Sequence, residues 1–434
     1  MGLAAEEGGR QAEGQLPASE ELLDGAQQPL DLPPGLLDEQ VAFPTVFVDT
    51  GRLALREARP ADCQRVNEAL AEAFDRVHPG PVAGQALLKV HIGEPRCATR
   101  MRPEHAVASA RFLRDRGASG VVAGDTTVAY TGPRGHRRNP VGDASTYLAL
   151  AREHGWAKDG PAGVPFVVLD RPSTALAGAF EFGPAEERRW ISGVERFGDF
   201  YLAGGFGAAD FVVNHAHLTL HGLAGVAGCV KSLAMGCTSL PGKLRMHQSL
   251  FPRFDEDKCV LCGQCVESCP AEALHLPEGA ARPVVDKDAC IGCGECVAVC
   301  AVRRGAVRLR GETITNWQRG MATLGERMTD YALGLMNGTW RSTIHVLHLY
   351  AVTPLCDCLN TSQTPMVGRD VGFLVGKNPF AIDLLGARKL IEVLQAEGQD
   401  VEDPQLHSAQ KAAAYAARAY AVLQNTPMET IDAS

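Results

Sequence analysis

Short apolar runs alternate along the chain with segments in which apolar residues recur at helical spacing. The runs predict buried strands over 86–92, 120–124, 164–170 and 210–215. Helices are expected between them over 103–116 and 146–154, each followed closely by a glycine that ends the pattern. This alternation predicts a mostly parallel sheet that is covered on both faces.

The alternation stops at residues 255–310 and resumes afterwards. Strands are expected over 344–352 and 371–376, and a helix with Pro379 in its first turn follows them. The fold class is therefore α/β, with a smaller α+β module inserted into one larger domain. The expected parts are a disordered acidic tail (1–40), the first part of the α/β domain (41–254), the inserted module (255–310), the second part (311–400) and a C-terminal helix and tail (401–434).

Composition excludes several classes of protein. With 434 residues, 45% apolar and 21% charged, the chain is neither disordered, nor collagen-like, nor a small disulfide scaffold. Residues 1–40 account for nearly all of the net charge of -9, because this segment has nine acidic residues and one basic residue, Arg10. No basic cluster exists that would indicate a nucleic-acid partner.

We expect a cytoplasmic protein without a membrane span. The acidic N-terminus has no basic segment followed by an apolar one, as a signal peptide would. Residues 211–230 carry no Lys, Arg, Asp or Glu, but they include His215, His217 and His221, which are costly in hydrocarbon. A buried strand followed by a glycine-rich turn is the interpretation we favour for this segment.

Eight of the fourteen cysteines lie between residues 259 and 300. They form two C-x2-C-x2-C-x3-C runs, and in such runs the fourth cysteine ligates the cluster of the other run. Cys259, Cys262, Cys265 and Cys300 are expected to hold one [4Fe–4S] cluster, and Cys290, Cys293, Cys296 and Cys269 the second. The segment resembles a bacterial two-cluster ferredoxin, except that Ala301 stands where that family usually has proline. Structural zinc is the alternative, but it would not require this repeated spacing.

Polar residues follow most of the predicted strands. They are His91 with Glu94, Asp125 with Thr126 and Thr127, Asp170, Asn214 with His215 and His217, and Cys356 with Asp357 and Cys358. Because parallel strands end at one edge of a sheet, these side chains are expected to share a ligand-binding crevice. The alternatives are turn-capping carboxylates at Asp125 and Asp170, and a core histidine at His215.

Residues 222–247 combine glycines with Lys231, Cys237, Lys243 and His247. Glycines around an embedded lysine could cradle an anionic ligand, although no phosphate-binding motif is present. The alternative is a tightly packed helix whose lysine extends to solvent. Cys356 and Cys358, with Asp357 between them, could join Cys237, His217 or His247 around a third metal, or face a redox substrate. They could equally be small buried residues.

Several segments together resemble one family. LLKVHIGEP, AHLTLHGLAGVAGCVKSLAMGC, GKLRMH and CDCLN, in this order, are similar to the DUF362 family of uncharacterized iron–sulfur centre proteins, over roughly residues 85–395. The resemblance implies a ferredoxin module set between two parts of an α/β domain. Members usually have Lys before a Gly-His pair where this chain has His215-Ala216-His217, so His217 takes the matching histidine position.

We therefore expect an iron–sulfur electron-transfer protein whose clusters supply a redox site in the α/β domain. Lys231, Lys243, His217, His247 and Asp357 are the candidate catalytic residues, which would bind or protonate a small anionic substrate. A redox partner protein is expected as well. Two alternatives remain: a docking module that delivers electrons to a partner oxidoreductase, and a maturation factor that handles metal or cluster cargo. No flavin or nicotinamide motif is present.

Overall fold

A computed structural model gives the fold of the chain. It describes residues 28–29, 45–51, 53–128, 132–136, 138–172, 180–221, 224–247, 251–269, 272–286, 290, 296, 299–300, 305–310, 323–358, 360–367, 369–399, 401 and 428–433. The expected acidic tail and the expected helix near the C-terminus lie outside these residues, apart from β1 (Gln28–Pro29), Val401 and β17 (Met428–Asp432).

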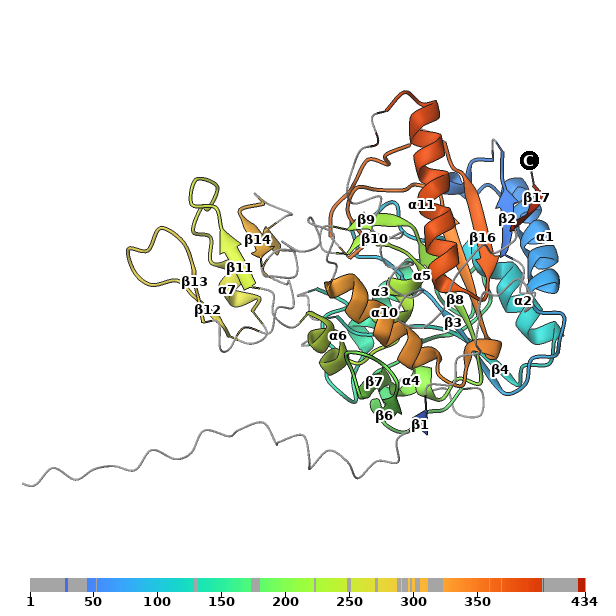
Figure 1. Cartoon of the computed structure of the whole chain (residues 1–434), viewed down its shortest axis with the longest axis horizontal. Helices are drawn as coiled ribbons and strands as arrows, with labels where there is room; N and C mark the ends of the chain where they lie inside the picture. Colours follow the sequence, from blue (N-terminus) through green and yellow to red (C-terminus); the bar gives the residue numbers. More distant parts are fainter. Residues whose placement is uncertain are drawn as a thin grey trace, which may run out of the picture.

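An eight-stranded sheet forms the centre of the main body (Figure 1). Its order is β17, β2 (Thr45–Asp49), β16 (Gly372–Gly376), β15 (Thr343–Leu349), β8 (Phe211–His217), β3 (Gln85–Lys89), β4 (Gly120–Asp125) and β5 (Phe166–Val168). Strand β16 runs against both of its neighbours, while the other strands of this sheet share one direction. The predicted α/β class with a mostly parallel sheet is confirmed.

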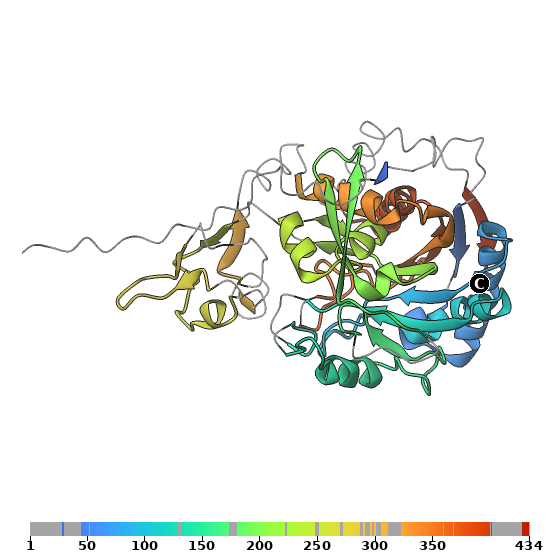
Figure 2. The same ribbon diagram turned by 90° about the horizontal axis from the view of Figure 1, so that it is seen from below.

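Helices cover both faces of the sheet. On one face lie α1 (Pro60–Val77), α2 (Val107–Asp115) and α3 (Ser145–Glu153), and on the other α5 (Cys229–Ala234), α10 (Thr323–Met336) and α11 (Pro379–Ala396), as Figure 2 shows. Strand β3 illustrates why: Ala86 and Leu88 pack into the first helix layer, whereas Leu87 packs into the second. A strand that is apolar on both sides needs cover on both sides.

The strand order reverses between β3 and β8. From β3 the chain adds β4 and β5 outward on one side, then returns to place β8 on the opposite side of β3, with β15 next to β8. In open α/β sheets such a reversal opens a crevice at the carboxyl ends of the two strands, because their connections leave in opposite directions. The fold thus places a crevice beyond Lys89 and His217, where these two strands end.

Most of the expected helices and strands lie where local features of the sequence predicted them. Pro379 occupies the first turn of α11, and the Asn378 side chain accepts hydrogen bonds from the amides of Phe380 and Ala381 there. The helix expected over 103–116 is observed as η2 (Pro103–Ala106) followed by α2. The segment 211–230 begins with the expected buried strand, β8, but the strands β9 (Thr219–His221) and β10 (Gly225–Ala227) and the start of α5 follow where a glycine-rich turn was expected.

The remaining described elements complete the main body. They are η1 (Leu55–Glu57), β6 (Glu186–Ser192), β7 (Asp199–Ala203), α4 (Gly204–Gly207), α6 (Leu240–His247) and η4 (Trp340–Ser342). Strands β6 and β7 form an antiparallel pair that β1 extends. No helix among the described residues is long and apolar enough to cross a membrane.

The cysteine-rich segment forms a separate lobe beside the main body in both views (Figures 1 and 2). Strand β11 (Phe251–Phe254) pairs with β14 (Val307–Arg310), and β12 (Leu274–His275) pairs with β13 (Val284–Val285), around the short helix α7 (Gln264–Glu267). Cys265, Leu274, Cys296 and Val307 form its small core. Strand β11 lies just before residue 255, so the paired strands of the lobe begin at Phe251.

The packing of α11 on the sheet gives a stability prediction. A Cβ atom at Gly386 would lie 2.4 Å from Cδ2 of Leu347, so Gly386→Ala overpacks this contact. We expect it to lower the free energy of unfolding by about 1–3 kcal/mol, although alanine itself favours helix by roughly 1 kcal/mol. Chemical denaturation followed by circular dichroism measures the change.

Two further variants test the cause. Leu347→Ala removes the clashing atom, so Gly386→Ala in that background should be neutral or stabilising. Gln395→Ala, at an exposed position of the same helix, should change stability little. If Gly386→Ala lowered the free energy of unfolding equally in the wild type and in Leu347→Ala, the clash with Leu347 would not be the cause.

Candidate functional site

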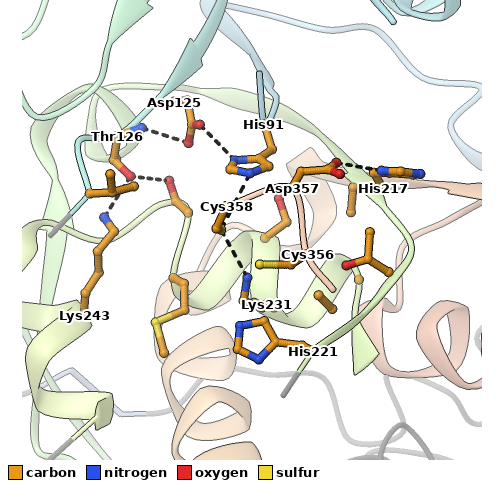
Figure 3. A pocket seen from close by; sticks show the side chains of 18 of the residues that line it. His91, Asp125, Thr126, His217, His221, Lys231, Lys243, Cys356, Asp357 and Cys358 are labelled. Atoms are coloured by element: carbon orange, nitrogen blue, oxygen red, sulfur yellow. Dashed lines mark hydrogen bonds and ion pairs between the residues drawn. The ribbon is translucent and has the colours of Figure 1, made fainter. Parts of the chain in front are cut away.

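A cavity opens at the carboxyl edge of the sheet, at the reversal between β3 and β8 (Figure 3). Its wall combines strand ends with side chains from α5, α6 and the loop after β15. The space, its open mouth included, measures about 920 Å³. Its chemically active lining residues are Lys89, His91, Asp125, Arg134, His217, His221, Lys231, Lys243, His247, Cys356, Asp357 and Cys358.

The buried carboxylate of Asp125 organises one wall. Oδ1 lies 3.0 Å from Lys89 Nζ, and Oδ2 lies 3.1 Å from an Arg134 guanidinium nitrogen and 2.8 Å from the Tyr147 hydroxyl. His91 Nδ1 stands 3.3 Å from the same oxygen. Burial raises the pKa of Asp125, but the charges of Lys89 and Arg134 outweigh it and hold that pKa well below its ordinary value. The carboxylate therefore stays ionised.

His217 and Asp357 form a buried ion pair on another wall. Nδ1 of His217 donates to Asp357 Oδ2 at 2.7 Å, and Nε2 donates to the Tyr350 carbonyl at 2.6 Å. Since both partners are acceptors, both ring nitrogens must carry hydrogen, which makes the ring an imidazolium. Burial lowers the pKa of His217, but the charge of Asp357 outweighs it and raises that pKa. The pair fixes the loop after β15 against β8.

Cys358 is the cavity's candidate nucleophile. Its Sγ lies 3.8 Å from Lys231 Nζ and 3.7 Å from His91 Nε2 (Figure 3). A hydrogen bond from the Cys356 thiol lowers the pKa of Cys358, and although burial opposes this, the charges of Lys231 and His91 lower it further, to well below its ordinary value. The same hydrogen bond and burial raise the pKa of Cys356. The pair thus holds a thiolate at Cys358 and a thiol at Cys356.

Lys243 and His247, both on α6, supply further polar groups. Lys243 Nζ donates to Thr126 Oγ1 at 2.8 Å and to the Thr238 carbonyl, both neutral oxygens, and burial lowers its pKa to about 8. Burial, together with the charge of Lys231, lowers the pKa of His247 to about 4. Nδ1 of this neutral ring is buried and has no hydrogen-bond partner among the described residues. The ammonium and the ring nitrogen are therefore available to a ligand.

The structure brings most of the residues singled out from the sequence into this cavity. Lys231, Lys243, His217, His247, Asp357, Cys356 and Cys358 all line it, as do His91, Asp125 and Thr126. Asp170 instead connects the segments that follow β4 and β5, by accepting hydrogen bonds from the Thr127 amide and hydroxyl. Glu94 forms an ion pair with Arg134 without lining the cavity.

Two expected site residues are part of the core. Asn214 bonds to Ser232 and His345, and His215 lies fully buried between Ser109 and His348. For His215, therefore, the core-histidine alternative is the correct one. Burial also lowers its pKa to about 3, which keeps the ring neutral.

The structure does not place Cys237 with Cys356 and Cys358. Cys237 is buried behind the cavity, and its thiol lies 3.8 Å from the Ser232 carbonyl. In the part of the chain that the structure describes, no three His, Cys, Asp or Glu side chains converge as ligands of a single metal ion. The candidate third metal site at Cys237, Cys356 and Cys358 therefore gains no support.

Lys89, Arg134 and His221 line the cavity without having been predicted. Lys89 is the last residue of an apolar strand, and Arg134 lies in the loop that follows β4. Lys89 could have been found from the sequence on physical grounds. A lysine among buried apolar residues needs a carboxylate partner, and Asp125 ends the neighbouring strand.

A second cavity lies in the lobe. Cys259, Cys262, Cys265 and Cys300 line it together, although 31 residues separate Cys300 from Cys269, the last cysteine of the first run. Burial, and then the negative charges of the other three cysteines, raise the pKa of Cys265 to about 11, so these thiols are close enough to repel as thiolates. The four residues expected to share a cluster are thus brought together.

The other four cysteines are described only in part. Cys296 belongs to the small core of the lobe, and Cys269 packs against it and lies 3.3 Å from the Ala273 amide. Cys290 is half-buried. Cys293 lies outside the described residues.

Comparison with known proteins gives one finding. A family model described as "Domain of unknown function (DUF362)" matches residues 86–388, which include the strands around the first cavity and the whole lobe. No curated protein and no solved structure matches the chain.

Cys358 should show unusual thiol reactivity. Because Lys231 stabilises its thiolate, Lys231→Met should raise the midpoint of the pH dependence of its alkylation by roughly one pH unit, while Lys231→Arg should largely preserve it. Iodoacetamide rates, read by mass spectrometry of the tryptic peptide 342–369, measure the effect. A wild-type midpoint at or above that of an ordinary cysteine would contradict the assignment.

The His217–Asp357 pair predicts a pH dependence. His217 should titrate above the ordinary histidine pKa in the wild type and below it in Asp357→Asn, because burial then acts without the opposing charge. The pair's contribution to stability is lost at high pH as His217 deprotonates through its raised pKa. It is lost at low pH as Asp357 protonates through its lowered pKa. Histidine NMR titration checks both midpoints, and an unchanged His217 midpoint in the variant would contradict the pairing.

Proposed function

The chain belongs to the DUF362 family, whose description assigns no function, and on that premise we propose that it is an iron–sulfur electron-transfer protein. Two [4Fe–4S] clusters would be held by the lobe, and the cavity of the α/β domain would be the redox site that they serve. The observation that carries the proposal is the gathering of Cys259, Cys262, Cys265 and Cys300 around one cavity.

The donor set fits a cluster better than a single ion. A zinc ion needs four ligands that converge on one point, whereas each cysteine of a [4Fe–4S] cube binds a different corner. A cavity lined on several sides by four thiols therefore suits the cube. Four neighbouring thiolates also repel one another, and bound iron would remove that repulsion. Cys290, Cys293, Cys296 and Cys269 would hold the second cluster by the same sequence pattern.

When bound, the two clusters supply one-electron reduction and oxidation. The chain's own residues would do the rest. Gly263, with a φ of 72°, turns the backbone between Cys262 and Cys265, a conformation that glycine adopts without strain. The lobe also starts beside the first cavity, since His247 is the last described residue before it and Phe251 the first within it.

The charges of the first cavity favour an anionic substrate. Lys243 donates only to neutral oxygens in the hydrogen bonds described above, so its charge would be met by a bound anion. With a pKa of about 8 it could also give a proton near neutral pH. His247 would accept a hydrogen bond at Nδ1 from a protonated group, or protonate with the ligand.

A redox partner protein would dock at the lobe. Val260 and Leu261, 53% and 44% exposed, lie between Cys259 and Cys262 at the rim of the four-cysteine cavity. Exposed apolar side chains beside a redox centre suit a small, transient contact. Delivery of electrons to a partner oxidoreductase rather than to the first cavity is the alternative that this surface supports.

Iron and sulfide analysis of anaerobically purified protein tests the proposal. We expect about eight irons and matching sulfide per chain, with paramagnetic resonance signals of reduced clusters after dithionite. Cys300→Ser and Cys259→Ser should each lose up to about four irons, because the two residues would share one cluster.

Cys63→Ser is the matched control, since Cys63 is half-buried on α1, outside the lobe, and should leave the iron content unchanged. Zinc in place of iron and sulfide, persisting after reconstitution, would overturn the proposal.

A further inference from the structure

Cys356 and Cys358 are two free thiols in one turn at the wall of the first cavity. Cys356 is buried, while Cys358 is half-buried and faces Lys231 and His91 (Figure 3). Residues i and i+2 of a turn lie closer together than in a strand, within the Cα separation that a disulfide spans. The two sulfurs are also close enough for each to shift the pKa of the other.

The two thiols have unequal surroundings. The Lys231 ammonium at 3.8 Å and His91 at 3.7 Å stabilise a negative sulfur at Cys358, which is therefore suited to attack. Cys356 is buried, and its pKa is raised even though the charge of Lys231 also acts on it, so it is suited to remain a thiol until a mixed disulfide needs resolving. Attacking and resolving roles of this kind are the requirements of dithiol–disulfide exchange.

We propose that Cys356 and Cys358 form a reversible disulfide and serve as the two-electron centre of the cavity. The inference deepens the proposed function and depends on it for the supply of electrons. The disulfide would also supply a two-electron carrier, which is needed between single-electron donors and most organic substrates. The sequence has no flavin or nicotinamide motif for that task.

On reduction the Cys356–Cys358 S–S bond breaks, taking up two electrons and one proton. The proton goes to Cys356 as a thiol, and Cys358 remains a thiolate beside Lys231. The electrons come as two single equivalents from the iron–sulfur donor of the proposed function, or in vitro from a dithiol, which is itself oxidised to its disulfide. Oxidation by a two-electron acceptor in the cavity reverses the step.

The tryptic peptide 342–369 allows a direct test, because it contains these two cysteines and no other. The full-length protein is equilibrated anaerobically in mixtures of reduced and oxidised dithiothreitol and then alkylated, and the peptide is weighed. We expect it to pass from two alkyl groups to none in a single step as the mixture becomes more oxidising. Peptide 57–65, which contains only Cys63, should not form a disulfide at any mixture.

A second measurement traps the intermediate. Cys356→Ser treated with the anionic disulfide 5,5'-dithiobis(2-nitrobenzoate) should keep one thionitrobenzoate adduct on peptide 342–369. The wild type should release that adduct as Cys356 displaces it and closes the disulfide. Cys358→Ser should acquire no such adduct at neutral pH, because the remaining thiol is buried.

The outcomes separate this inference from the proposed function. A disulfide that forms equally in iron-loaded and iron-depleted protein supports the dithiol, whatever the iron content proves to be. A peptide that stays fully alkylated in the most oxidising mixture, or pairs with a cysteine elsewhere, overturns the inference and leaves the iron–sulfur assignment standing.

Discussion

The first cavity depends on one buried charge that has to be neutralised. Asp125 ends β4 with its carboxylate almost fully enclosed, and an unpaired ion in that position would cost several kcal/mol. Lys89 from the adjacent strand and Arg134 from the following loop supply the compensation. Arg134 and Asp125 in turn hold His91, whose other ring nitrogen faces Cys358. Removing Asp125 would leave Lys89 without its carboxylate partner and Arg134 with Glu94 alone, so this side of the cavity depends on that one carboxylate.

The sheet determines which chain segments can meet at this wall. Because the strand order reverses between β3 and β8, the loops after these strands leave in opposite directions and the space between them stays open. Helices α5 and α6 bring Lys231 and Lys243 to that space, and the loop after β15 brings Cys358. The lobe starts directly after α6. The lobe proposed to hold the clusters therefore starts a few residues after His247, which lines the same cavity as the proposed thiol pair.

Much of this arrangement could be predicted from the sequence. His91, Asp125, His217 and Asp357 follow strands whose apolar runs are local signals, and a parallel sheet gathers such ends at one edge. The antiparallel direction of β16 could not be predicted, because it depends on pairing with the distant β2. Cys237 is nearer to Lys231 in the sequence than His247 is, yet it lies between α5 and α6 and packs into the core, which depends on tertiary packing that the local pattern does not show. The roles proposed for Cys356 and Cys358 could not be predicted either, because the contacts of Cys358 are with residues more than a hundred positions away.

Electron transfer from the lobe to the cavity is the step on which the proposed function rests. It can be measured in iron-loaded protein whose peptide 342–369 has first been oxidised to the disulfide. The clusters are reduced photochemically without oxygen, and their visible absorbance is followed in the dark with no acceptor added. The absorbance should recover in the wild type, while both thiols of the peptide become available to alkylation, and it should stay bleached in Cys358→Ser. A wild type that stays bleached with its disulfide intact would contradict electron transfer between the two parts of the chain.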